Sequence, residues 1–433
     1  MGMEQSALDP AVVDIDNADR LSDLNADYDH LQGKLDRSGV SVEAVRRRLS
    51  GFELAIPTWG VGTGGTRFAR FPQPGEPRHI FDKIEDCGVI RKLSVVTPRV
   101  SPHFPWDCVE DYAALREYAA AFGLGFDAVN SNTFQNQPDQ VESYKFGSLS
   151  HTSPAVRAQA IAHNMDCIGY GKALGSRALT VWVGDGSNFP GQTDFMRSFD
   201  RYLDSMKAIY DGLPDDWRVF IEHKMFEPAF YSTVIQDWGS NILAAQTLGD
   251  KAKCLVDLGH HAPNTNIEMI VARLHHFGKL GGFHFNDSKY GDDDLDSGSI
   301  DPFRLFLVFN ELVEAEGREG SAFSAAYMMD QSHNVTDPIE SLMNSAEAIV
   351  GAYARALLVD RDALHHHQQE NDVLMAHNCL KTAFETDVRP LVAMMRYEAG
   401  GAIDPIAAYR RSGYRAAVAA RRPATGQSGS GIV

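Results

Sequence analysis

The feature that most constrains the fold is an alternation of short apolar runs with longer amphipathic stretches, which begins near Phe52. Each run is rich in β-prone residues, and a polar or glycine-rich loop separates it from a stretch with helical periodicity. Eight runs qualify as strands, at 52–57, 100–104, 124–129, 178–183, 218–222, 253–257, 282–285 and 325–330. Eight strands that alternate with helices over roughly 300 residues predict an α/β fold of the (β/α)8 TIM barrel type. A doubly wound parallel sheet is the alternative.

The sequence on either side of this repeat predicts further helices. Residues 1–50 are acidic and carry sparse Leu and Val at helical spacing, which predicts an N-terminal helical segment. Residues 51–360 are the predicted barrel and catalytic domain, and residues 361–433 predict a C-terminal helical extension that we expect to make oligomer contacts. Two barrel helices have marked starts, because Asp301–Pro302 and Asp337–Pro338 each place a capping residue before a first-turn proline.

The charge balance and the cysteine usage exclude several classes of protein. With 40 Lys and Arg against 58 Asp and Glu, the net charge is −18, whereas a nucleic-acid binder needs a basic face. No run approaches the ~20 consecutive apolar residues of a membrane span, and the acidic N-terminus is unlike a secretory signal. The 5 cysteines contain no CxxC and fit reduced thiols. We therefore predict a cytoplasmic protein with neither a nucleic-acid nor a membrane partner.

Ionisable residues stand at the ends of four consecutive predicted strands. In a (β/α)8 barrel the carboxyl ends of all strands meet at the face that carries the active site. Strands five to eight bring Glu222, Asp257, His284 and Asp330 to that face. Three converging carboxylates without basic partners repel one another strongly at reduced dielectric, and a divalent cation removes that repulsion. The alternative is that each acid only caps the following helix, which is common for a single residue.

A second set of ligand types follows the same strands. His260 lies three residues after Asp257, and the loop after the seventh strand includes Asp292 and Asp294. With Asp257 as a bridge, these residues could hold a second ion close to the first. Oxygen-dominated ligands with one imidazole per site favour Mn²⁺ or Mg²⁺ over Zn²⁺ or copper, and Co²⁺ is a common substitute.

Lys224 lies two residues after Glu222, so both side chains point to the same face of an extended strand. A lysine beside carboxylates of this kind can donate a hydrogen bond to a carbonyl oxygen and stabilise the charge that develops there. The alternative is a surface lysine at a strand end.

Two other patterns carry less weight. Residues 60–65 match G-x-G-x-x-G, but prolines at 72, 74 and 77 argue against a helix at these glycines, so dinucleotide binding is not expected. A group of arginines near the C-terminus predicts a basic patch that packs against the acidic N-terminal segment. These arginines are Arg410, Arg411, Arg415, Arg421 and Arg422.

Five segments at these positions resemble bacterial L-rhamnose isomerase, in its broad-substrate branch within the xylose-isomerase-like barrels. They read EHKM at 222–225, VDLGHHAPN at 256–264, GFHFND at 282–287, DDDLD at 292–296 and DQSHN at 330–334. The resemblance runs from about residue 50 to 360 and implies two Mn²⁺ ions per subunit. It implies that a structural ion is held by Glu222, Asp257, His284 and Asp330. It implies that a catalytic ion is held by Asp257, His260, Asp292 and Asp294.

The resemblance also implies a sugar site and an assembly. Positions that line the sugar site in that family match Trp59, His103, Phe134 and Trp182, which lie at or just beyond the first four predicted strand ends. The family forms homotetramers in which an aromatic from the glycine-rich first loop, here Phe68, reaches into a neighbour's pocket. We expect Lys224 and Asp330 to act in catalysis.

The expected reaction is the isomerisation of L-rhamnose to L-rhamnulose, with activity on other aldoses. Such a reaction moves a hydrogen between C1 and C2 and protons between O1 and O2, and two metal ions suit it. The sequence leaves open a hydride shift or an enediol with a carboxylate base. The main alternative is a ketose 3-epimerase on the same barrel, which has no use for His260, Asp292 and Asp294. A metal-dependent phosphodiesterase and a non-catalytic sugar-binding protein are less consistent with these residues.

Overall fold

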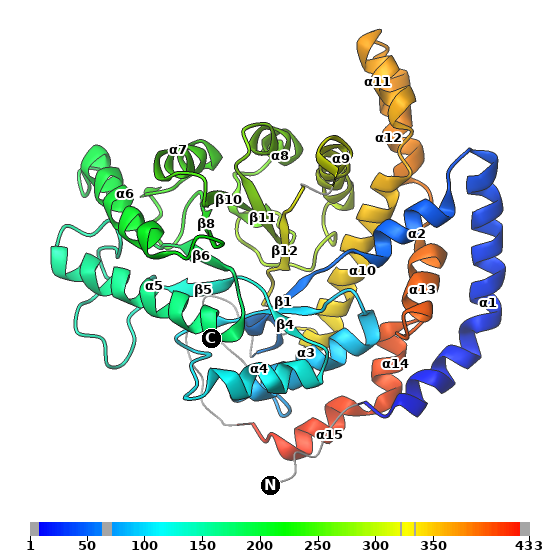
Figure 1. Cartoon of the computed structure of the whole chain (residues 1–433), viewed down its shortest axis with the longest axis horizontal. Helices are drawn as coiled ribbons and strands as arrows, with labels where there is room; N and C mark the ends of the chain where they lie inside the picture. The colour runs from blue at the N-terminus through cyan, green and yellow to red at the C-terminus, as the bar shows by residue number, and fades with distance from the viewer. Residues whose placement is uncertain (1–7, 63–71, 321–322, 333–334, 425–433) are drawn as a thin grey trace.

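The computed structural model describes residues 8–62, 72–320, 323–332 and 335–424, and its centre is a barrel of parallel strands (Figure 1). The sheet has 10 strand segments, and these fill the positions of an eight-stranded barrel because the second and third positions are each split in two. The first three positions are β1 (Ala55–Pro57), β2 (Arg99–Ser101) continued by β3 (His103–Phe104), and β4 (Gly125–Phe126) continued by β5 (Val129–Asn132). β2 pairs with β1 and β4, whereas β3 pairs with β5.

Five further strands complete the barrel. They are β6 (Ala178–Trp182), β8 (Arg218–Glu222), β10 (Ala252–Asp257), β11 (Leu280–Phe285) and β12 (Ala326–Met329). Every neighbouring pair is parallel, and β12 pairs with β1 where Met328 lies opposite Ala55, so the ring is closed. The predicted (β/α)8 fold is therefore confirmed, and the doubly wound alternative is wrong. A short antiparallel pair, β7 (Gly186–Ser187) with β9 (Ser232–Thr233), forms a separate sheet.

One helix follows each barrel position. The eight are α3 (Ile80–Ser94), α4 (Tyr112–Ala121), α5 (Pro154–Leu174), α6 (Phe195–Gly212), α7 (Trp238–Leu248), α8 (Ile267–His276), α9 (Pro302–Glu319) and α10 (Pro338–Leu357). Both marked starts are confirmed, because Asp301 accepts a hydrogen bond from the Arg304 amide and Asp337 accepts one from the Ile339 amide. α3 begins at Ile80, after all three prolines of the first loop.

The third barrel position extends further than its apolar run. The run ends at residue 129, whereas β5 continues through Asn130, Ser131 and Asn132, all of which are buried. Asn130 donates to the Ser101 hydroxyl at 3.1 Å and to the Pro102 carbonyl at 3.2 Å. Buried polar side chains can complete a strand when their partners come from the next strand, and an apolar pattern does not detect them.

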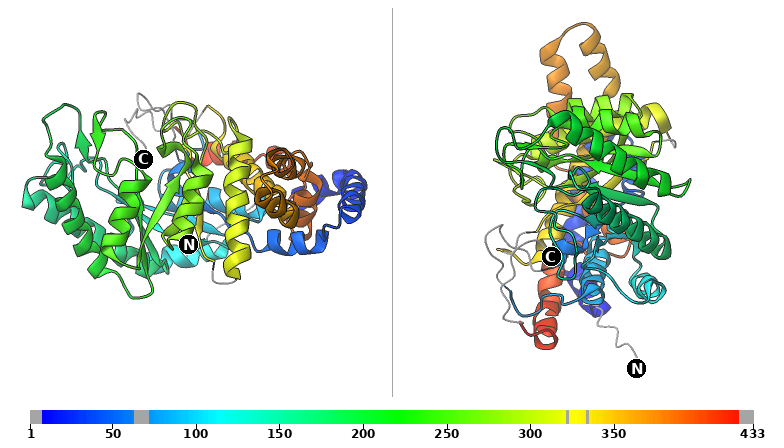
Figure 2. Two further views of the ribbon diagram at one scale, coloured as in Figure 1. Left: turned by 90° about the horizontal axis from the view of Figure 1, so that it is seen from above. Right: turned by 90° about the vertical axis from the view of Figure 1, so that its left-hand side faces the viewer.

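Helices at both ends of the chain pack along one side of the barrel (Figure 1), and their presence agrees with the helical segments predicted from the sequence. They are α1 (Pro10–Arg37) and α2 (Val42–Ser50), then α11 (Arg361–Gln369), α12 (Val373–Phe384), α13 (Arg389–Glu398), α14 (Pro405–Ser412) and α15 (Tyr414–Arg421). α11 and α12 form a hairpin that projects away from the barrel (Figures 1 and 2). Within the described part of the chain, no helix combines the length and the apolar character that a membrane crossing needs.

The C-terminal arginines do not all contact the acidic N-terminal segment. Arg411 does so, with Nε 3.4 Å from Asp16 and Nη1 2.8 Å from Asp19 on α1. The other four pair with the first and last barrel helices and their N-terminal caps. Arg410 pairs with Glu340, Arg415 with Asp337, Arg421 with Glu85, and Arg422 with Asp82, Glu85 and Asp86. The predicted ion pairing with the N-terminal segment is therefore right for Arg411 and wrong for the other four arginines. At the level of the helices the predicted packing does occur, because α14 packs against α1 as well as against α3 and α10.

Candidate metal and substrate site

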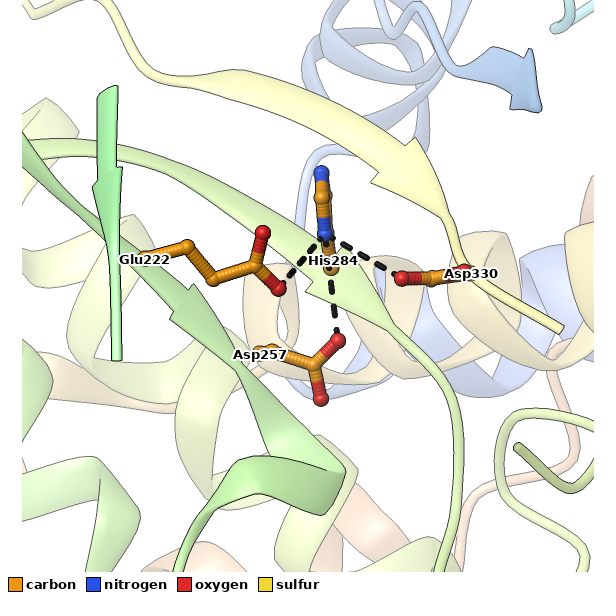
Figure 3. A group of neighbouring side chains, drawn as sticks. All are labelled: Glu222, Asp257, His284 and Asp330. Carbon is orange, nitrogen blue, oxygen red and sulfur yellow. Dashed lines mark hydrogen bonds and ion pairs between the residues drawn. The ribbon is translucent and has the colours of Figure 1, made fainter. Parts of the chain in front are cut away.

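Four side chains from consecutive strands converge at the carboxyl end of the barrel (Figure 3). Glu222 ends β8, Asp257 ends β10, His284 lies within β11, and Asp330 follows β12. Figure 3 shows the imidazole between the three carboxylates, with Nδ1 3.1 Å from Glu222, 3.2 Å from Asp330 and 3.8 Å from Asp257. One ligand atom from each lies within 4.8 Å of the others. We call these four residues the first ligand group, and the structure brings together the set predicted from the sequence.

A second ligand group consists of Asp257, His260 and Asp292, whose ligand atoms also lie within 4.8 Å of one another. His260 lies in η2 (Leu258–His260), directly after β10, with Nε2 3.4 Å from Asp292 Oδ2. Its Nδ1 lies 3.0 Å from the His223 carbonyl oxygen, which orients the ring. Asp257 belongs to both groups, as a bridging ligand would.

Asp294 is the one predicted ligand outside these two groups. It lies beside Asp292, and burial together with the Asp292 charge raises the pKa of Asp294 well above its usual value. Its backbone has a φ of 49°, a left-handed conformation that is uncommon for residues other than glycine. Its Oδ2 accepts a long hydrogen bond of 3.5 Å from the Ser332 hydroxyl.

The chemistry of these donors fits divalent cations. Among the described residues, the buried oxygens Asp257 Oδ2 and Asp292 Oδ1 have no hydrogen-bond partner. A buried carboxylate oxygen without a donor is costly unless a cation or a proton satisfies it. Burial raises the pKa of Asp257 to about 7, and although burial opposes it, Glu222 and Asp330 raise the pKa of His284 to about 10. The upward shift of the His284 pKa reflects the negative charge of the carboxylates around it.

Asn286 fixes the carboxylate that the two ligand groups share. Asp257 Oδ1 accepts hydrogen bonds from the Gly259 amide at 2.7 Å and from Asn286 Nδ2 at 2.9 Å, which leaves Oδ2 for the two groups. Asn286 is buried two residues after His284. The sequence analysis missed this role, although a polar residue at the end of a buried strand was a signal for it.

Lys224 lies beside the second ligand group and is buried. Its Nζ donates to Asp292 Oδ2 at 2.5 Å and lies 3.7 Å from Glu227 Oε2. Burial lowers the pKa of Lys224, but the Asp292 carboxylate outweighs it, and the net shift is upward. The ammonium also lies 5.1 Å from the centre of the Trp182 ring, at cation–π distance. Glu227, which the sequence analysis did not identify, has a φ of 79° and places a second carboxylate near the Lys224 ammonium.

The predicted sugar-site aromatics form a continuous row of rings, which we call the aromatic wall. Ring centres are separated by 5.1 Å between Trp59 and His103, 5.9 Å between His103 and Phe134, and 4.6 Å between Phe134 and Trp182. Trp182 continues the row to His260 at 6.4 Å. Trp106, missed in the sequence, adds a ring 4.7 Å from His103. Phe68 lies outside the described residues.

A buried aspartate supports the first part of this wall. Asp107 Oδ2 accepts hydrogen bonds from the Thr58 hydroxyl at 2.5 Å and from the His103 amide at 2.8 Å, and Oδ1 accepts one from Lys83 Nζ at 2.8 Å. These contacts hold in place His103 and the residue before Trp59. Nothing in the local sequence marked Asp107, because two of its three partners, Thr58 and Lys83, come from other segments.

The comparisons with known proteins give two close relatives in sequence and a shared fold among solved structures. The sequence matches no family model. It is 67% identical to a "probable sugar isomerase" of Rhizobium meliloti (strain 1021), over 98% of both chains. It is 63% identical to a "probable sugar isomerase" of Mesorhizobium japonicum, over 100% of both chains. Among solved structures, an L-ribulose 3-epimerase superposes with a TM-score of 0.52 at 13% identity, over 75% of this chain and 98% of that chain, which shows a shared fold.

Proposed function

This chain belongs to the sugar isomerase family of its two rhizobial relatives, and on that premise we propose that it is a metal-dependent aldose–ketose isomerase. The proposed reaction is the conversion of L-rhamnose to L-rhamnulose, with activity on other aldoses. The observation that carries this proposal is the pair of ligand groups that share Asp257, next to Lys224 and the aromatic wall. Isomerisation uses both groups, whereas a ketose 3-epimerase needs one.

The proposed cofactor is a pair of Mn²⁺ ions per subunit, for which Mg²⁺ or Co²⁺ can substitute. Glu222, Asp257, His284 and Asp330 would hold the structural ion. Asp257, His260, Asp292 and Asp294 would hold the catalytic ion. Carboxylates with one imidazole suit these cations. When bound, the two ions supply Lewis acidity at the sugar oxygens.

The side chains of this chain supply the rest of the proposed chemistry. Lys224 Nζ donates a hydrogen bond to the carbonyl oxygen of the open-chain sugar and stabilises the negative charge that develops there. This role is the same whether hydrogen passes directly between C1 and C2 or through an enediol. Trp59, Phe134 and Trp182 present apolar faces to the C–H side of the sugar and to its 6-methyl group. Because burial lowers the pKa of His103 to about 3, this side chain is neutral at the wall.

The test of the proposal is the product formed from L-rhamnose. Purified protein is treated with EDTA, then Mn²⁺ is restored, and the products are identified by NMR. We expect L-rhamnulose to form with Mn²⁺ and to be lost on chelation. Epimerisation of ketoses without any conversion of L-rhamnose or other aldoses would replace the proposal by the 3-epimerase alternative.

We also propose that the enzyme assembles as a homotetramer. The support is the α11–α12 hairpin, whose Val373 and Leu374 are 78% and 68% exposed on a projecting element. Large apolar side chains on such an element are typical of a surface that a partner covers. Light scattering during gel filtration measures the assembly mass, and a mass of one subunit contradicts this proposal.

A further inference from the structure

We propose that α14 and α15 form a clamp that fixes the spacing of two active-site loops, with Arg415 as the positioning residue at its centre. The first loop lies between β1 and α3, and its described residues are 58–62, which include Thr58 and Trp59, and 72–79. The eighth loop lies between β12 and α10, and its described residues are 330–332, which begin with Asp330, and 335–337. The clamp's effect on sugar binding rests on the proposed function, whereas the clamp itself does not.

The two loops touch at their inner ends. The indole Nε1 of Trp59 donates a hydrogen bond to Asp330 Oδ1 at 2.8 Å. At Gly60, a Cβ atom would lie 3.1 Å from the Gln331 carbonyl oxygen, so a larger residue would push the loops apart. The position of Trp59 in the aromatic wall therefore depends on how closely these loops approach each other.

Arg415 joins the outer ends of the same loops. Its Nε donates to Asp337 Oδ2 at 2.6 Å and its Nη2 to Asp337 Oδ1 at 2.9 Å, which is a bidentate contact to the eighth loop. Its Nη1 donates to the Gly75 carbonyl oxygen of the first loop at 3.0 Å. One planar guanidinium thus holds both loops, and its rigid fork fixes their relative position in a way that a lysine cannot.

Other contacts secure each loop to the tail. The Gly75 amide donates to the Arg422 carbonyl oxygen at 2.8 Å, so Gly75 is held through both of its backbone groups. Gly75 has a φ of 91°, and a Cβ there would lie 3.3 Å from both Arg415 Cδ and the Ala419 nitrogen, so the close approach requires glycine. On the eighth loop, the Tyr409 hydroxyl of α14 donates to Asp337 Oδ2 at 3.0 Å.

A buried ion cluster anchors the clamp to α3. Arg422 is 1% exposed, and its guanidinium donates to Asp86 Oδ1 at 2.9 Å and to Glu85 Oε2 at 2.6 Å. The Tyr414 hydroxyl donates to the same Asp86 oxygen at 2.6 Å. Breaking a buried pair of this kind is strongly unfavourable, so the anchor is rigid. α14 contacts both α3 and α10. In Figure 1, α15 (red) continues from α14 and runs below α3 and α4.

The first experiment measures the loops directly, by amide hydrogen exchange of Arg415→Met in the full chain. We expect exchange in peptides that cover residues 72–79 and 330–337 to rise about tenfold, because charge-assisted hydrogen bonds to both loops are lost. Arg410→Met is the matched control. Arg410 lies on α14 and makes a bidentate ion pair with Glu340 on α10, but this pair involves neither loop. Unchanged exchange in Arg415→Met, or an equal rise in both variants, overturns the clamp.

The second experiment measures sugar turnover by the Mn²⁺-loaded variants. In Arg415→Met we expect KM to rise about tenfold while kcat and metal content change less than twofold, since binding geometry is affected more than chemistry. Arg415→Lys should restore part of the affinity because it can still reach one loop. If Arg415→Met lowers kcat as much as it raises KM, or if Arg410→Met raises KM to the same extent, Arg415 has a merely structural role. Either result overturns the positioning assignment.

The two experiments separate the clamp from the proposed function. If the unaltered protein turns over no sugar but exchange rises in Arg415→Met alone, the clamp stands and the isomerase proposal fails. If Arg415→Met does not fold, Asp337→Asn tests the same contact. An asparagine oxygen can still cap the Ile339 amide, but the bidentate ion pair is lost, so exchange in both loops should rise. Unchanged exchange in Asp337→Asn overturns the clamp.

Discussion

Trp59 and Asp330 are joined by a hydrogen bond of 2.8 Å from the indole Nε1 to Oδ1 of the carboxylate. This contact links the aromatic wall to the first ligand group, because Asp330 Oδ2 lies 3.2 Å from His284 Nδ1. The two oxygens of one carboxylate therefore serve different parts of the site. Changes at the wall and changes at the ligand group should have separable effects.

Trp59→Phe keeps an aromatic ring but removes the indole donor. We expect KM for L-rhamnose to rise about tenfold, since a hydrogen bond to a charged acceptor is lost and the ring is held less firmly. Metal content should stay close to that of the unaltered protein, because Oδ2 of Asp330 is not involved. Kinetics and elemental analysis of the same preparation measure both, with Trp238→Phe on α7 as a control. A large loss of metal would show that the indole orients the ligand.

Asp330→Asn preserves the size of the side chain and removes its charge. We expect both metal content and activity to fall, because an amide is a weaker ligand for a hard divalent cation than a carboxylate. Elemental analysis after dialysis, followed by assay at saturating Mn²⁺, measures the two effects. Full metal content together with full turnover would remove Asp330 from the proposed ligand set.

Lys224→Ala removes the proposed electrophile without removing a ligand. We expect kcat to fall by about 10²-fold or more, the usual effect of losing one donor to a developing oxyanion. Metal content should remain nearly unchanged. Steady-state kinetics with metal analysis measures both quantities. If kcat were retained, Lys224 would be a structural partner of Asp292 and not a catalytic residue.

His103 should make the protein sensitive to acid. Burial lowers the pKa of His103 from 6.5 in the unfolded chain to about 3 in the folded protein. Below pH 6.5 the unfolded chain therefore binds a proton that the folded protein excludes, and stability falls as the pH drops toward 3. We expect His103→Gln to reduce the slope of stability against pH in this window by at most about 1.4 kcal/mol per unit. Urea unfolding of both proteins at pH 7, 5 and 4 measures the slopes. Identical slopes would show that His103 is protonated without cost.

The barrel and the first ligand group could be predicted because they depend on local patterns. An apolar run records where a strand begins and ends, and the residue after it must lie at the carboxyl face of a parallel barrel. Glu222, Asp257, His284 and Asp330 are each the first polar residue after such a run, or close to it. The tertiary structure brings these four together as the strand order requires. Nothing about side-chain contacts was needed to identify them.

The partners of charged and polar side chains could not be predicted in this way. Asp107, Asn286 and Arg415 are ordinary polar residues in the sequence, and each acquires its role from segments far along the chain. The tail arginines illustrate the difficulty, since an acidic N-terminal segment and the acidic face of α3 are equally plausible partners by charge alone. Charge attracts at a distance without direction, whereas the packing of α14 against α1, α3 and α10 decides which acids lie within hydrogen-bond distance. The sequence by itself therefore determined the strands, their order along the chain and the candidate ligands at their ends. Only the tertiary structure decided which side chains hold those ligands in place.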